Sequence, residues 1–171
     1  MFILSLQFKL FYHLQNTLGD LSVLIKQYCP EIICITESWL TRDIPDIAVN
    51  LDGYHLIRKD RSSGAGGGVA PYISSNINCH ELPVENADNF EILWTILRPK
   101  QLPRPLSCLI LAVVYCPPPK KKNYDAFTMK KLSSFIVTSC DKLLRDYPDA
   151  GVLLTGVFNS LDTNQSFLQI S

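Results

Sequence analysis

The segment Thr36–Leu40 carries the first acidic side chain that could take part in catalysis. Glu37 follows Ile32–Thr36, a short and mostly β-branched run typical of a strand buried on both faces. Because ligand crevices in α/β sheets form at the carboxyl ends of strands, we expect Glu37 to lie where a ligand can bind. Carboxylate oxygens suit Mg²⁺ or Mn²⁺. The alternative is a solvated loop acid beside a packed Trp39.

Two further polar side chains follow predicted buried strands. Tyr115 ends the strand before a proline segment, and its phenol could hydrogen-bond a phosphate or a carboxylate. Asn159 follows the last strand and could orient a water or a phosphate oxygen. The alternatives are an interior tyrosine with its hydroxyl at the rim, and a turn-forming asparagine. The lysines Lys120–Lys122 either contact a phosphate backbone or are simply solvated.

The glycine-rich segment Asp60–Val69 is not a known phosphate loop. No Gly-Lys-Ser/Thr follows it, and Val69 stands where a dinucleotide fingerprint needs its last glycine. We therefore predict a flexible turn that brings Asp60 and Arg61 near a site.

Composition narrows the class of protein. The chain has 171 residues, 16 Lys+Arg against 16 Asp+Glu, and 47% hydrophobic residues, which excludes general disorder and a polybasic binder. Its six cysteines form no CxxC pair, so reduced thiols are expected, and Cys34, Cys108 and Cys116 lie in apolar runs that place them in the core. The N-terminus lacks the features of a signal peptide, and no apolar run reaches the ~20 residues of a membrane span. These features predict a soluble, intracellular protein with no membrane partner.

The hydrophobic pattern predicts a layered α/β domain. Between its helix–strand beginning and its helix–strand end lie strands whose short connections favour antiparallel pairing. Pro71 interrupts one of these strands because it cannot donate to a ladder. The last strand is expected to lie at a sheet edge without neighbours. The predicted helices cover residues 13–28 and 124–147, the latter capped by Asn123, and the predicted strands 32–36, 54–59, 69–74, 90–97, 107–116 and 151–155.

Together these segments resemble the endonuclease/exonuclease/phosphatase superfamily, and above all the endonuclease domain of LINE-type (non-LTR) retrotransposons. The resemblance covers about residues 13–160 and implies a four-layer α/β/β/α sandwich, here one domain over residues 1–171 that is incomplete at its C-terminus. Six ordered segments carry it: Pro30–Leu40, Gly53–Arg61, Gly66–Val69, Phe90–Trp94, Val114–Pro118 and Leu153–Asn159.

The resemblance implies metal-assisted hydrolysis of a phosphodiester in DNA. Glu37 matches the ligand of Mg²⁺ (or Mn²⁺), while Tyr115 and Asn159 match the catalytic tyrosine and asparagine. Arg58 and Arg61 are expected to bind the DNA substrate. In this chemistry the metal neutralises developing charge and a general base activates water.

The sequence departs from the family's pattern at its general base. Val157 stands where the family has an aspartate, and Asp162 lies five residues further on. The family's C-terminal Asp-His pair is not found before Ser171. Because acid–base catalysis contributes about 10²–10⁴-fold in rate, we expect a retroelement-derived endonuclease that is inactive or strongly impaired.

Other interpretations stay open from the sequence, including whether the chain is an enzyme at all. One is a non-catalytic DNA-binding or interaction remnant of the same fold, with salt-dependent binding through its arginines and lysines. A phosphoinositide or sphingolipid phosphodiesterase fits less well, because the segments Thr36–Leu40 and Gly64–Val69 are retroelement-like. Action on genomic DNA would place the protein in the nucleus, and no obligate protein partner can be inferred.

Overall fold

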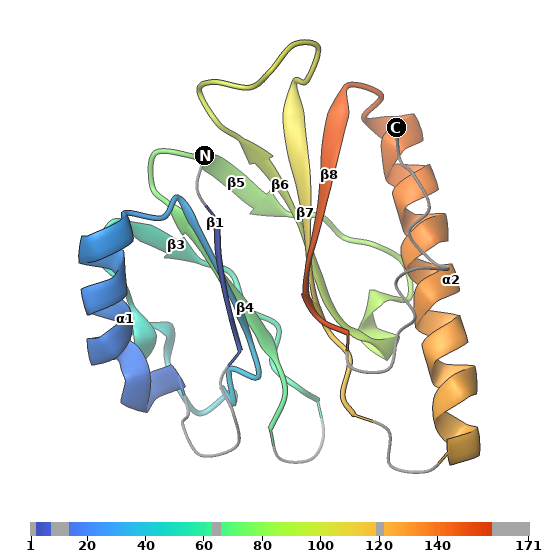
Figure 1. Ribbon diagram of the computed structural model, residues 1–171, viewed down its shortest axis with the longest axis horizontal. Helices are drawn as coiled ribbons and strands as arrows, with labels where there is room; N and C mark the ends of the chain where they lie inside the picture. Colours follow the sequence, from blue (N-terminus) through green and yellow to red (C-terminus); the bar gives the residue numbers. More distant parts are fainter. Residues whose placement is uncertain (1–2, 8–13, 63–65, 119–121, 159–171) are drawn as a thin grey trace.

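Two four-stranded sheets face each other, and one long helix covers the outer face of each (Figure 1). The computed structural model describes residues 3–7, 14–62, 66–118 and 122–158. The first sheet has the order β1-β2-β4-β3 and the second the order β5-β6-β7-β8. The elements are β1 (Ile3–Gln7), α1 (Leu14–Tyr28), β2 (Ile32–Thr36), a 3₁₀ turn (Asp46–Val49), β3 (Tyr54–Leu56), β4 (Val69–Ser74), β5 (Asn78–Glu81), a second 3₁₀ turn (Ala87–Asn89), β6 (Glu91–Arg98), β7 (Cys108–Tyr115), α2 (Lys122–Asp146) and β8 (Ala150–Val157).

Three hydrophobic layers hold this sandwich together. Alternation along β2 illustrates how they form: Ile33 and Ile35 pack under α1, whereas Cys34 packs between the two sheets. The middle layer joins inner-face residues of both sheets, including Leu111 and Val113 of β7. The third layer lies between the second sheet and α2. The predicted α/β/β/α four-layer sandwich is therefore confirmed.

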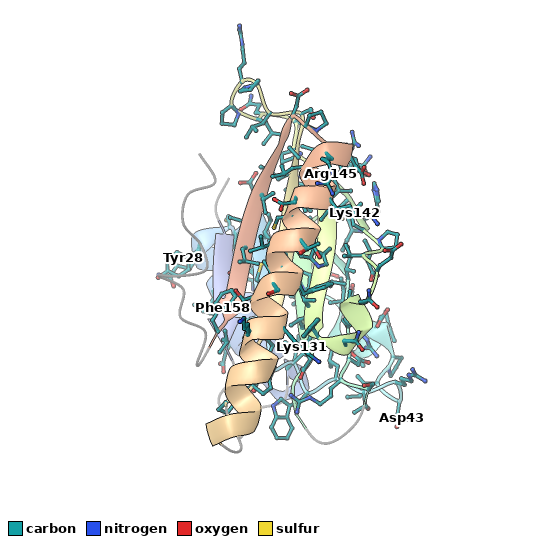
Figure 2. The ribbon with its side chains drawn as sticks, turned by 90° about the vertical axis from the view of Figure 1, so that its right-hand side faces the viewer. Tyr28, Asp43, Lys131, Lys142, Arg145 and Phe158 are labelled. Carbon is teal, nitrogen blue, oxygen red and sulfur yellow. The ribbon has the colours of Figure 1, made fainter. Side chains whose placement is uncertain are left out.

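The long helix α2 is amphipathic. Its buried side chains recur at helical spacing and pack on the second sheet, whereas Lys131, Lys142 and Arg145 are exposed (Figure 2). Phe158, just after β8, packs against the same hydrophobic layer. The buried residues of this stripe are Leu132, Ile136, Cys140 and Leu143. No helix in the described part of the chain is long and apolar enough to cross a membrane.

Strand pairing in the centre of the chain is antiparallel, as predicted. The parallel pairs are β1 with β2 and β7 with β8. Within the described residues β8 pairs only with β7, so it forms an edge of the second sheet. Cys34, Cys108 and Cys116 are buried free thiols, which confirms their predicted place in the core.

Pro71 does not break β4, because its missing N–H affects pairing with the short strand β3, while β4 stays paired with β2 at this position. The Pro71 carbonyl accepts a hydrogen bond from the Ile57 N–H (3.1 Å), but proline has no N–H to return the bond. Pairing with β3 stops at this point, so β3 ends at Leu56 rather than at Lys59 as predicted. A single bridge between Lys59 and Val69 resumes the contact.

Two further strands and the start of the long helix also differ from the sequence prediction. The strands β1 and β5 were not expected, and both lie at sheet edges. The residues of β5 are mostly exposed, so no alternating apolar pattern marks it. The helix α2 begins at Lys122, which places Asn123 inside its first turn and makes the predicted cap wrong.

Candidate active site

Glu37 and Tyr115 meet at one end of the sandwich, although they come from different sheets. Glu37 follows the last residue of β2, and Tyr115 is the last residue of β7. The Tyr115 hydroxyl donates a hydrogen bond to the Glu37 carboxylate. Burial, followed by this hydrogen bond and the charge of Glu37, raises the pKa of Tyr115 well above its usual value. The phenol therefore stays protonated and orients the carboxylate.

The register of the second sheet places three residues in one row beside this contact. Tyr115 pairs with Glu91 on one side and with Val157 on the other. Residues paired in this way point to the same face of a sheet, and Tyr115 and Val157 both pack in the layer between the sheets. Position 157 therefore faces the site, but its isopropyl group can neither accept a proton nor orient water.

Arg61 approaches the site over the ring of Tyr115. Its guanidinium carbon lies 5.8 Å from the ring centroid, within the range of a cation–π contact. The same guanidinium donates to Glu91 through Nε (2.9 Å) and through an Nη (2.5 Å). Arg61 was expected from the sequence to bind substrate, and the structure places it beside Tyr115.

Arg58 is engaged in the neighbouring loop instead. It donates to the carbonyl oxygens of Thr41 (2.9 Å) and Ile44 (2.8 Å). It also pairs with Asp46 at 3.0 Å and Asp60 at 2.9 Å. These contacts tie Arg58 to the loop that follows the Glu37 segment.

The turn Gly66–Gly68 supports the Glu37 segment directly. The N–H groups of Ser38 and Trp39 donate to the carbonyls of Gly68 (3.3 Å) and Gly67 (3.0 Å). Gly67 has φ +76°, a conformation that L side chains rarely adopt, and a Cβ there would displace the ends of the Glu91 and Arg61 side chains.

The backbone of the Glu37 segment is itself strained. Glu37 and Trp39 both have φ +57°, a conformation that non-glycine residues adopt rarely and that concentrates at functional sites.

Structures of similar architecture are found among solved proteins. A humanised D. rerio TDP2 matches with TM-score 0.62 and 13% identity over 98% of this chain and 67% of its own. The human nocturnin catalytic domain, crystallised with a sulfate anion, matches with TM-score 0.62 and 13% identity over 92% and 62%. A Neisseria 3′ phosphatase, NExo, bound to a product DNA hairpin, matches with TM-score 0.62 and 18% identity over 92% and 57%.

This chain has the endonuclease/exonuclease/phosphatase fold. At 13–18% identity the likeness shows the fold alone. No protein-family model matches the sequence, and no curated protein matches it. The chain spans 57–67% of the length of these three structures.

The endonuclease/exonuclease/phosphatase fold here offers few metal donors. No cluster of three His, Cys, Asp or Glu side chains that could hold a metal exists in the described ranges. The Glu91 carboxylate accepts hydrogen bonds from Arg61 and from the Gly68 N–H (2.6 Å), and Glu37 is the acid that contacts Tyr115. Mg²⁺ is commonly held by one or two carboxylates plus substrate phosphates and waters. The donor set therefore fits Mg²⁺ or Mn²⁺ shared with a phosphate, and does not fit a closed structural zinc site.

Other expected site residues lie outside the described part of the chain, namely Asn159, Asp162, Lys120 and Lys121. Lys122 is the first residue of α2. Glu91 is a site residue that sequence reasoning missed, although it lies in one of the segments that carry the resemblance. The sequence does show an acid at the start of a predicted buried strand, but only the strand register shows that Glu91 lies beside Tyr115.

The raised pKa of Tyr115 predicts how stability depends on pH. Its unfolded pKa is near 10 and its folded pKa is higher, so its contribution is complete below pH 10 and is lost as pH rises further. We expect Tyr115→Phe to flatten the fall in unfolding free energy above pH 10, by at most about 1.4 kcal/mol per pH unit. Urea titrations of both proteins from pH 9 to 11.5 measure this. Equal slopes would contradict the buried, hydrogen-bonded phenol.

Proposed function

We propose that this chain carries a divalent-metal phosphodiesterase site that acts on DNA and derives from a retroelement endonuclease. We further propose that Val157 leaves hydrolysis strongly impaired. The observation that carries the proposal is the contact between Glu37 and Tyr115, which joins the ends of β2 and β7. Both residues match the family's motif positions in the sequence.

The structures of similar fold support a phosphate-ester substrate. NExo is described as a 3′ phosphatase and holds a DNA hairpin product. A D. rerio TDP2 structure holds a single-strand DNA product. The LINE-like segments of this sequence favour DNA cleavage among the reactions of this fold, and genomic DNA as the target would place the protein in the nucleus.

Each residue of the site has a proposed role. Glu37 would hold Mg²⁺ or Mn²⁺, and a bound divalent ion supplies charge neutralisation at the phosphate. Tyr115 orients the Glu37 carboxylate through its hydrogen bond. We propose that Arg61, which lies over the Tyr115 ring and pairs with Glu91, borders the bound DNA at this site, and that Arg58 holds the adjoining loop. We propose that Asn159, which follows β8 in the sequence, orients the attacking water or a phosphate oxygen.

The proposed impairment follows from position 157. This position shares a row with Tyr115 on the inner face, where a general base could reach water near the Glu37 carboxylate. Valine supplies no base, and without one the hydrolysis loses about 10²–10⁴-fold in rate.

A non-catalytic DNA-binding remnant is less well supported. Its expected cations include Arg58 and Arg61, and both face carboxylates of this chain. These ion pairs offset much of the positive charge that a salt-dependent DNA binder needs.

Mn²⁺ binding tests the metal part of the proposal. We expect Glu37→Gln to weaken Mn²⁺ binding by at least about tenfold, because even the loss of a group that only orients a metal ligand lowers metal affinity by about 10–100-fold. Electron paramagnetic resonance measures the Mn²⁺ affinity. The matched control is Glu85→Gln, because Glu85 is exposed and pairs with Lys142 far along α2. Equal Mn²⁺ affinity in the natural chain and Glu37→Gln would overturn the site.

Nicking of supercoiled plasmid in Mg²⁺ tests the impairment. We expect the folded natural chain to nick no faster than Glu37→Gln. Rapid nicking that Glu37→Gln abolishes would show that the site works without an acid at position 157, and the impairment would be wrong.

A further inference from the structure

Glu91 connects two segments that are distant from it in the sequence. Its Oε1 accepts two hydrogen bonds from Arg61, which is 30 residues away along the chain. Its Oε2 accepts a hydrogen bond from the backbone N–H of Gly68, 23 residues away, at 2.6 Å. The side chain of Glu91 is only 19% exposed. Both oxygens of one half-buried carboxylate are therefore committed to different parts of the site.

The first arm of this arrangement reaches Glu37 through the glycine turn. Glu91 fixes the N–H of Gly68, and the carbonyl of the same residue accepts the N–H of Ser38. Gly67 continues the contact by accepting the N–H of Trp39, whose indole lies against Gly66. The backbone of the strained Glu37 segment is thus tied to Glu91 through two successive hydrogen bonds.

The second arm reaches Glu37 through Tyr115. Glu91 is the register partner of Tyr115 and holds the Arg61 guanidinium over the Tyr115 ring. The Tyr115 hydroxyl in turn donates to Glu37. Both arms therefore reach Glu37, one through the backbone of its segment and one through its side chain.

We infer that Glu91 is a positioning residue for the Glu37–Tyr115 site, rather than one half of an ordinary ion pair. An exposed ion pair contributes little, typically about 0–1 kcal/mol, and leaves its surroundings unchanged when removed. Glu91 is half-buried and joins Arg61 to Gly68, so its loss releases the turn as well as the cation. This inference rests on the proposed function only for the role of Glu37 as a metal ligand.

Trp39 provides a readout that does not depend on metal binding. The chain has two tryptophans, and Trp94 is 1% exposed. Subtracting the emission of Trp39→Phe isolates the fluorescence of Trp39, and acrylamide quenching then reports how well the indole stays packed on Gly66. The variants are Glu91→Gln, which keeps the volume and an acceptor but loses the charge, and Glu91→Ala, which loses both. Glu85→Gln is the control for removal of an exposed paired carboxylate.

We expect quenching of Trp39 to rise in Glu91→Ala, to rise less in Glu91→Gln, and to stay unchanged in Glu85→Gln. Mn²⁺ affinity is expected to fall about tenfold in Glu91→Gln, as for groups that orient a metal ligand. Circular dichroism establishes that each variant is folded, and Glu91→Gln carries the test if Glu91→Ala does not fold.

Unchanged quenching in a folded Glu91→Gln would overturn the inference. Increased quenching with unchanged Mn²⁺ affinity would also overturn it, because the turn would then move without affecting Glu37. If the natural chain binds no Mn²⁺ at all, the proposed function fails, and the quenching of Trp39 alone decides the role of Glu91.

Discussion

Replacing Gly156 by alanine is expected to prevent the chain from folding stably. Gly156 lies near the end of β8 with φ +137°, where L side chains are strained. A Cβ there would be driven into the Val114 carbonyl oxygen and would lie 2.8 Å from the Val114 nitrogen and carbonyl carbon. These are backbone atoms of the central strand β7, which cannot yield without breaking the ladder. We expect a loss of about 4 kcal/mol or more, in the range of the most damaging single substitutions.

The matched control is Gly151→Ala in the same strand. A Cβ at Gly151 would meet the Leu109 side-chain Cδ2 at 2.8 Å, and a side-chain terminus can move aside. Urea denaturation followed by circular dichroism compares the two variants with the natural chain. If Gly156→Ala were as stable as Gly151→Ala, the close approach of β8 to β7 at this point would be wrong.

Introducing an aspartate at position 157 is expected to raise plasmid nicking in Mg²⁺ by about 10²-fold, the lower end of what a general base contributes. The row that contains Tyr115 and Val157 places the new carboxylate on the inner face, next to the Glu37 contact. The side chain is half-buried there, so we also expect a stability loss of about 1–3 kcal/mol from burying a polar group. The initial rate of conversion of supercoiled to open-circle DNA measures the gain.

Two companion variants separate basicity from size. Val157→Asn has nearly the same shape as Val157→Asp but cannot take up a proton, so it should leave nicking at the level of the natural chain. Combining Val157→Asp with Glu37→Gln should remove the gain. Equal rates for Val157→Asp and Val157→Asn would contradict the role assigned to position 157.

Apolar runs were enough to predict the buried strands. The strands β2, β4, β6, β7 and β8 were expected from their β-branched residues, because a strand buried on both faces needs a continuous apolar sequence. The edge strand β5 could not be predicted, since its residues are mostly exposed and only pairing with β6 makes it a strand. Such pairing depends on contacts between residues distant in sequence.

The candidate site was predictable where its residues end strands. Glu37 and Tyr115 were identified because each lies at the carboxyl end of a predicted buried strand, where ligand crevices form, but the sequence did not indicate that the two strands belong to different sheets. Two of the partners of Arg58 were not predictable, because they are carbonyl oxygens of a loop 14 and 17 residues away. The role of Glu91 required the strand register and the closing of the glycine turn.

We expect the Glu37 end of the sandwich to bind a divalent ion together with a phosphate. Crystals of the natural chain and of Glu37→Gln, grown with MnCl₂ and inorganic phosphate, test this through anomalous scattering from Mn²⁺. We expect an anomalous peak about 2.1 Å from a Glu37 carboxylate oxygen, a metal–oxygen distance usual for Mg²⁺, and no such peak in Glu37→Gln. A peak elsewhere, or one that persists unchanged in Glu37→Gln, would contradict it.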